Sequence, residues 1–263
     1  MRCKMYKEEI KKVAHSAEIK SEYINDSIFK YFLLAFMAGF FVIVGIALSY
    51  STAGIINVDG KLYGKLAVGL TFSIALGLIY FAGGELFTGN CFVLTVGLLE
   101  KTISIKNTLK LLIVCYLGNL AGSIVSAYIY VKSGAPIGVA DKYLLKVAES
   151  KTHYPADELF LKAILCNFIV CLAVWLCYRL KEETAKLMML FWCIFAFATA
   201  GFEHSIANMA VFSAALILPH PDTFTMAGVL HNLGWVTLGN ILGGSLFLGL
   251  PYWYVSQGKK GKK

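Results

Sequence analysis

Charged residues and prolines are scarce in this chain of 263 residues. Asp, Glu, Lys and Arg account for 15% of the residues, against about 25% in soluble domains, and there are only 5 prolines. Apolar side chains account for 58% of the residues. This composition excludes a soluble single domain and a disordered chain, so we expect an integral membrane protein.

The sequence also lacks the residue spacings of common enzyme and metal sites. None of its 7 cysteines forms a C-x-x-C pair, and there is no phosphate-binding glycine loop, Walker pattern or nucleophile elbow. His15, His153, His220 and His231 fall at the ends of apolar runs or between them, which argues against a membrane haem protein. We therefore expect no cofactor, no metal and no enzymatic activity.

The apolar residues are concentrated in six runs. Four have the length of one bilayer crossing, at 31–50, 109–131, 159–178 and 226–255, whereas 66–99 and 187–218 are too long for one crossing and lack a polar turn for two. We predict an all-α protein with six transmembrane helices, in which the second and the fifth are interrupted.

The positions of the basic residues indicate the orientation in the membrane. The net charge is +8, but the charges lie between the apolar runs, which favours membrane topology over nucleic-acid binding. With six crossings, 17 of the 24 Lys and Arg residues fall on the side that holds both termini. The positive-inside rule therefore predicts that both termini are cytoplasmic.

Segments outside the six runs lie at both ends of the chain. Residues 1–30 precede the six-helix region 31–255, and 256–263 form a basic tail. Within 7–30, Ile10, Val13, Ala14 and Ala17 recur at helical spacing between Lys and Glu. The pattern predicts an amphipathic helix on a membrane or partner surface, or equally a solvated charged helix.

The two overlong runs repeat one pattern. Segment 83–90 reads Gly-Gly-Glu-Leu-Phe-Thr-Gly-Asn, and 201–208 reads Gly-Phe-Glu-His-Ser-Ile-Ala-Asn. A second signature follows each, Gly-Asn-Leu-Ala-Gly at 118–122 and Gly-Asn-Ile-Leu-Gly at 239–243. The chain thus predicts two repeats, 31–131 and 159–255, and because each has three crossings the second is inverted relative to the first.

Polar residues in the interruptions indicate a buried site. Freed backbone groups are tolerated at membrane depth only inside protein or beside a cavity, and the ends of half-helices favour an anion. Glu85, Glu203 and His204 are the only ionisable residues in the spanning cores. Since carboxylates on the route would repel an anion, we expect both glutamates to hydrogen-bond freed N–H groups, with Asn90 and Asn208 in the same structural role.

Other residues admit two interpretations. His204 is either a proton-exchanging or donating group on a permeation path or a neutral core histidine, and the repeat favours the first. Thr88 is either its hydrogen-bond partner or a helix cap. Phe72, Leu76 and Phe197 could form apolar gates, although packing is commoner, and Lys151 could attract anions or be merely solvated.

The two broken-span signatures, with Cys-Asn at 166–167, Cys-Leu-Ala-Val-Trp at 171–175 and Leu-Gly-Asn at 238–240, resemble the formate/nitrite transporter family over nearly the whole chain. The resemblance implies an aquaporin-like protomer without Asn-Pro-Ala boxes, a homopentamer with one pore per protomer, and small monovalent anions as substrates. Within the family the chain looks closest to the hydrosulfide-channel branch, so we expect hydrosulfide first, with formate and nitrite also permeating.

The resemblance also implies roles for individual residues. By motif, His204 is the central pore histidine and Thr88 its partner. Apolar constrictions and vestibule positions follow in the same way: Leu76 with Phe197 on the cytoplasmic side, Phe72 with Phe87 on the periplasmic side, Asn208 in the histidine motif, and Lys151 and Asn167 at the outer vestibule. Two rival functions stay open, an aquaporin-like channel for neutral solutes and a membrane scaffold or redox subunit without transport activity.

Overall fold

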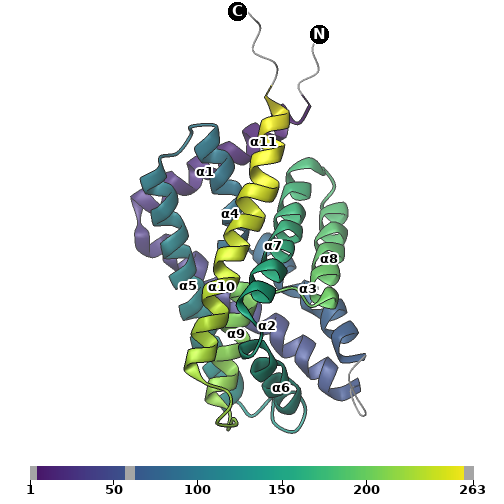
Figure 1. Cartoon of the computed structure of the whole chain (residues 1–263). Helices are drawn as coiled ribbons and strands as arrows, with labels where there is room; N and C mark the ends of the chain where they lie inside the picture. The colour runs from purple at the N-terminus through teal and green to yellow at the C-terminus, as the bar shows by residue number, and fades with distance from the viewer. Residues whose placement is uncertain (1–4, 57–62, 258–263) are drawn as a thin grey trace, which may run out of the picture.

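The computed structural model describes residues 5–56 and 63–257, and these residues form helices without strands (Figure 1). The elements in chain order are α1 (Lys7–Asp26), α2 (Ile28–Ile56), α3 (Tyr63–Ala82), α4 (Phe87–Leu99), α5 (Ile105–Lys132), α6 (Asp141–Thr152), α7 (Ala156–Arg179), α8 (Glu183–Ala200), α9 (Ser205–Ile217), α10 (Met226–Gly244), the π-helical turn η1 (Ser245–Gly249) and α11 (Leu250–Ser256).

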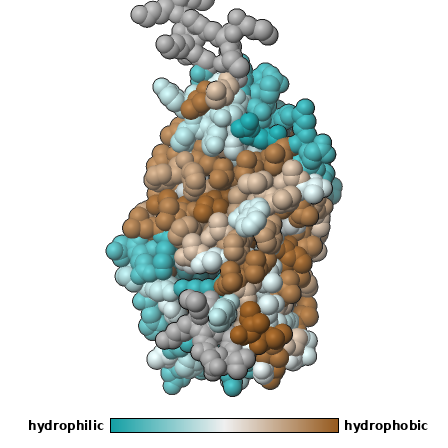
Figure 2. Space-filling model, turned by 90° about the vertical axis from the view of Figure 1, so that its right-hand side faces the viewer, coloured by the Kyte–Doolittle hydropathy of each residue, from teal (hydrophilic) through white to brown (hydrophobic). Residues whose placement is uncertain are grey.

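Within the described residues, six helical segments are long and apolar enough to cross a membrane: α2, α3, α5, α7, α8 and the continuous α10–η1–α11. Apolar side chains cover the middle of the face in Figure 2, and polar residues gather towards its two ends. Both overlong runs are interrupted, the first between α3 and α4 and the second between α8 and α9. The prediction of six crossings with a broken second and fifth is confirmed.

The two repeats interlock through their short half-helices. α2 packs against α3 and α5, and α7 packs in the same way against α8 and α10. α9 of the second repeat packs against α2 and α5 of the first, whereas α4 of the first packs against α7 and α10 of the second. The interruptions are thereby enclosed by long helices from both repeats, which is the setting that freed backbone groups require at membrane depth.

The N-terminal helix α1 lies against the protein itself. Its apolar stripe is buried, with Val13 and Ala17 fully inaccessible, and it packs chiefly on α4. The ring of Tyr6, just before α1, meets Trp175 and Tyr252 edge to face. The amphipathic helix expected from the sequence is therefore present, and its apolar side packs on the protein itself instead of on a membrane.

The end of the molecule opposite α1 and α11 is formed by α6, a short polar helix that the hydropathy pattern did not predict (Figure 1). Lys65 and Lys162 lie in α3 and α7. The basic tail proposed for 256–263 lies almost wholly outside the described residues.

Candidate functional site

The two interruptions have the same backbone path. Gly83 and Gly201 end the preceding helices at φ +83° and +76°, in the left-handed region that glycine adopts without strain. The next N–H group on each side donates back into the preceding helix, to Ile79 over 2.8 Å and to Phe197 over 3.1 Å. The sequence repeat is thus a structural repeat, and each break ends one helix and starts another.

Two buried asparagines hold the starts of the half-helices. Oδ1 of Asn119 accepts from the N–H of Phe87 over 3.0 Å, and Oδ1 of Asn240 accepts from the N–H of Ser205 over 2.8 Å. Each Nδ2 donates to the carbonyl of the glutamate in the break, Glu85 or Glu203, over 2.8 and 2.9 Å. The Gly-Asn signatures in α5 and α10 therefore supply the side chains that replace lost helical hydrogen bonds.

The side chain of Glu85 bonds to other side chains. It accepts from the Lys20 ammonium, from the Tyr31 hydroxyl over 3.0 Å and from Asn90 over 3.0 Å. The expectation that it caps freed N–H groups is wrong, because Asn119 already occupies that position. Burial alone would lower the pKa of Lys20, but the charge of Glu85 and its hydrogen bond outweigh this and raise the pKa above its usual value.

Glu203 has the corresponding arrangement at the second break. It accepts from Lys151 over 2.7 Å and from Asn208 over 2.6 Å, and its side chain is only 2% exposed. Nδ2 of Asn208 also donates to Asn232 over 2.8 Å. Lys151, for which the sequence left anion attraction or simple solvation open, is therefore the half-buried partner of a carboxylate. Among the described contacts, neither glutamate side chain bonds to a freed N–H group.

His204 begins α9 and its ring has a defined hydrogen-bonding pattern. Nδ1 accepts from the N–H of Ala207 over 3.1 Å, so in the neutral ring the proton lies on Nε2. Nε2 lies 3.0 Å from the Thr88 hydroxyl in α4 and therefore donates to it. The Thr88 hydroxyl proton is then left to donate to another acceptor, and the two half-helices meet at this buried pair.

Asn167 in α7 connects the two repeats next to the Thr88–His204 pair. It is fully buried, and its Nδ2 donates to the carbonyls of Thr88 over 3.1 Å and Asn240 over 2.6 Å. Cys171 also donates to the Thr88 carbonyl, over 3.2 Å. The outer-vestibule position implied for Asn167 is wrong in this structure, where the residue orients the backbone of Thr88.

The aromatic residues near the site are grouped differently from the expectation. Phe72 and Phe197 meet edge to face with ring centroids 6.4 Å apart, and Phe197 stacks on His204 at 5.8 Å. Phe87 instead packs against Tyr116 at 4.9 Å. The implied pair of Phe72 with Phe87 is therefore not among the ring contacts of the described residues. The Leu76–Phe197 constriction and a gating role for these side chains stay predictions.

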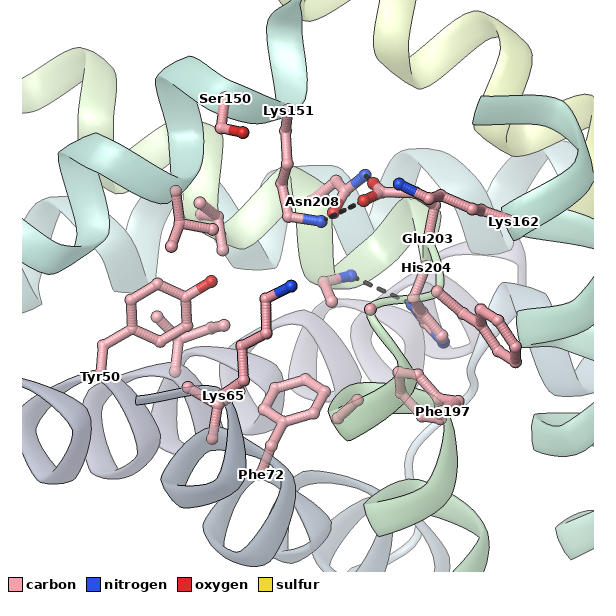
Figure 3. Close-up of a pocket in the computed structure, with 18 of the residues that line it drawn as sticks. Tyr50, Lys65, Phe72, Ser150, Lys151, Lys162, Phe197, Glu203, His204 and Asn208 are labelled. Atoms are coloured by element: carbon pink, nitrogen blue, oxygen red, sulfur yellow. Dashed lines mark hydrogen bonds and ion pairs between the residues drawn. The ribbon is translucent and has the colours of Figure 1, made fainter. Parts of the chain in front are cut away.

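A cavity of about 450 Å³ leads from the α6 end of the molecule to this site. Lys65, Lys151, Phe72, Phe197 and His204 all line it, and Figure 3 shows them converging from α3, α6, α8 and the second break. The walls combine ammonium groups near the mouth with aromatic rings near His204. This gradient from charged to apolar surface suits a small anion that must lose water before it reaches a hydrogen-bond donor.

Six crossings, inverted repeats and two enclosed breaks define a multi-pass membrane protein with a central polar site, an arrangement typical of channels and transporters. A family model described as formate/nitrite transporter matches residues 7–254. The chain belongs to the formate/nitrite transporter family, as its motifs indicated.

Relatives and solved structures agree with this assignment. The nitrite transporter NirC of Salmonella typhimurium strain LT2 is 40% identical over 96% of this chain and 93% of that protein, and the uncharacterized transporter YwcJ of Bacillus subtilis is 38% identical over 93% and 96%. Among solved structures, an FNT family ion channel has a TM-score of 0.89 at 40% identity over 94% of this chain and 98% of that chain. A pentameric formate channel with formate bound has a TM-score of 0.77 at 30% identity, over 88% and 98%.

Proposed function

We propose that this protein conducts small monovalent anions, nitrite foremost, through a pore in each protomer of a homopentamer in a bacterial cytoplasmic membrane. The observation that carries the proposal is the buried Thr88–His204 hydrogen bond, which joins the two broken helices at the inner end of the cavity. Nitrite is supported by the 40% identical NirC relative, a nitrite transporter. The structurally similar channel is a pentamer with formate bound, which supports both formate and the assembly.

The anion enters from the α6 side along the lysine-bearing wall. The Phe72–Phe197 ring pair favours a dehydrated ion, because an apolar surface offers a hydration shell no hydrogen bonds. Beyond the rings, the hydroxyl proton of Thr88, which His204 does not use, donates to the ion. The N-terminal ends of α4 and α9 meet at this point and add positive potential.

Hydrosulfide, the ion expected from the sequence, is the second candidate. The same aromatic pair favours a large, weakly hydrated ion whose neutral conjugate acid is also small. A proton taken up from the aqueous vestibule would convert the ion to neutral hydrogen sulfide before the apolar step, and the neutral ring of His204 would then supply only a hydrogen bond. Nitrite and formate have much weaker basicity, so this route would give hydrosulfide flux a distinct pH dependence.

Proteoliposome flux of nitrite, formate and hydrosulfide across a pH series tests the proposal. His204→Leu removes both ring hydrogen bonds and should lower nitrite flux at least tenfold, by about 1.4 kcal/mol or more of barrier. His15→Leu is the matched control because His15 is exposed on α1, and it should conduct normally. Unchanged flux and pH dependence in His204→Leu would contradict the central role of the ring.

The rival functions give different results in the same vesicles. Vesicles that contain a neutral-solute channel would swell in glycerol and show no anion flux. A scaffold or redox subunit would conduct nothing, or the purified protein would show a cofactor absorbance. Saturable nitrite flux without glycerol swelling would exclude both rivals.

A further inference from the structure

The cavity on the α6 side is larger than its proposed substrates require. Its volume of about 450 Å³ lies within the range of about 300–1,000 Å³ that is typical of pockets for drug-sized ligands. Nitrite, formate and hydrosulfide fill only a small part of such a space. A larger molecule can therefore enter the vestibule without entering the narrow route past the aromatic pair.

The cavity contains ammonium groups that are not engaged by carboxylates. Lys151 and Lys162 are paired with Glu203 and Glu158. Lys65 and Lys146 also line the cavity, and within residues 5–56 and 63–257 neither has a carboxylate within 4.0 Å. Figure 3 shows the Lys65 amine pointing into the open space between Tyr50 and Lys151. The vestibule thus offers an anionic group one or two positive charges.

The inner wall below these amines is apolar. Ile46, Val68, Phe72 and Phe197 contribute apolar side chains to the cavity lining. Figure 3 shows the ring of Phe72 next to the Lys65 side chain and the ring of Phe197 next to His204. Offset and edge-on contacts between aromatic rings stabilise by about 0.5–1.5 kcal/mol each beyond their buried area. An aromatic ring lying against this wall would keep an attached anionic group near Lys65.

We propose that the vestibule is a binding site for aromatic monoanions, which occupy it with the charge at Lys65 and Lys146 and the ring on Phe72 and Phe197. Such a molecule is too large to follow a nitrite ion past the ring pair and blocks the pore from the α6 side. The block rests on the proposed transport function, but the binding itself does not.

Benzenesulfonate is the probe, because it keeps its charge at neutral pH and does not cross bilayers as a neutral acid. Methanesulfonate is the matched anion without a ring, and benzyl alcohol is the matched ring without a charge. Calorimetry with the purified protein in detergent should show saturable benzenesulfonate binding that is at least tenfold tighter than binding of either control. Benzenesulfonate present on both sides of proteoliposomes should inhibit nitrite flux competitively.

Lysine variants locate the site. Lys65→Gln and Lys146→Gln should each weaken benzenesulfonate binding about fivefold, as expected for exposed charge pairs, and the double variant more strongly. Lys142→Gln is the control, because Lys142 lies on the same helix as Lys146 but does not line the cavity. Equal effects of Lys142→Gln and Lys65→Gln, or equal binding of methanesulfonate and benzenesulfonate, would overturn the proposal. Normal binding without nitrite flux would instead contradict the proposed function.

Discussion

At the scale of single residues, Asn240 holds the backbone of the second break through hydrogen bonds, although it lies in an apolar run. It accepts from Ser205 and donates to the carbonyls of Ala163 and Glu203, so all its hydrogen bonds lie inside the protein. Asn240→Leu leaves these three backbone groups without their partner, at about 1–3 kcal/mol each. We expect a loss of at least about 3 kcal/mol in unfolding free energy, measured by denaturation in mixed micelles.

Asn119→Leu should have a matching effect, because Asn119 makes the corresponding three bonds at the first break. Asn25→Leu is the control, since Asn25 is exposed and accepts only from Lys110 over 3.2 Å in the described contacts. A large loss in only one of the two buried variants would contradict the equivalence of the breaks.

The Lys151–Glu203 pair provides a second residue-scale prediction. Lys151→Met leaves the nearly inaccessible Glu203 carboxylate without its cation and should cost about 3 kcal/mol of unfolding free energy. The double variant Lys151→Met, Glu203→Gln removes the charge as well, so it should be more stable than the single variant. The coupling energy in a double-mutant cycle should be at least about 2 kcal/mol.

The exposed pair Lys30–Asp26 is the reference for this cycle. Its side chains are 59% and 65% exposed, and such pairs couple by about 1 kcal/mol or less. Similar coupling in both cycles would show that Lys151 is solvated and not held by Glu203.

The sequence identified the residues of the site better than their partners. Glu85, Glu203 and His204 stand out because ionisable groups are costly in a spanning core. Their partners come from distant segments, since Lys20 reaches Glu85 across 65 positions and Lys151 reaches Glu203 across 52. Spacing along one helix cannot indicate such contacts. Asn119 and Asn240 were visible as a repeated signature, but only the backbone path of the breaks shows what they bond.

At the scale of helices, α7 and α10 can approach closely because Gly243 has no side chain. A Cβ added to Gly243 would lie 2.3 Å from the carbonyl oxygen of Ile164, whereas one added to Gly234 in the same helix meets nothing within 4 Å. Gly243→Ala must separate the helices and should destabilise by about 1–3 kcal/mol. Gly234→Ala should be neutral or stabilise by up to about 1 kcal/mol, through helix propensity alone.

Thermal denaturation of the two variants in detergent checks this expectation. The pair is matched because both add one methyl group to α10. Equal shifts in midpoint temperature would show that α7 and α10 do not approach as closely as described.

The positions of helices could be predicted where hydropathy alone determines them. The excess length of 66–99 and 187–218, with polar residues inside each, was enough to predict both breaks. α6 was missed because it is short and polar, and its buried side depends on contacts with α9 and α10. The apolar stripe of α1 was recognised, but its partner α4 is itself created by the first break. The packing of α1 and α6 therefore depends on contacts between helices, which the periodicity of the sequence does not reveal.

At the scale of the whole molecule, the exchange of half-helices makes each repeat depend on the other. α4 packs against α7 and α10, and α9 against α2 and α5, so each half-helix packs on long helices of the other repeat. The Thr88–His204 bond crosses the same boundary. The Thr88–His204 junction thus forms only when both repeats are folded together. α1 covers the first break, and the cavity on the α6 side leads to the second.

This arrangement has two distinct ends, and their charges predict which end faces the cytoplasm. The end with α1 and α11 carries most basic residues, so the positive-inside rule places it inside and the cavity outside. The six described cysteines are buried, which gives a Cys3→Ser chain a low labelling background. A membrane-impermeant maleimide should label Lys142→Cys on intact cells. It should label Lys106→Cys, at the start of α5, only after permeabilisation, and the reverse pattern would place the cavity in the cytoplasm.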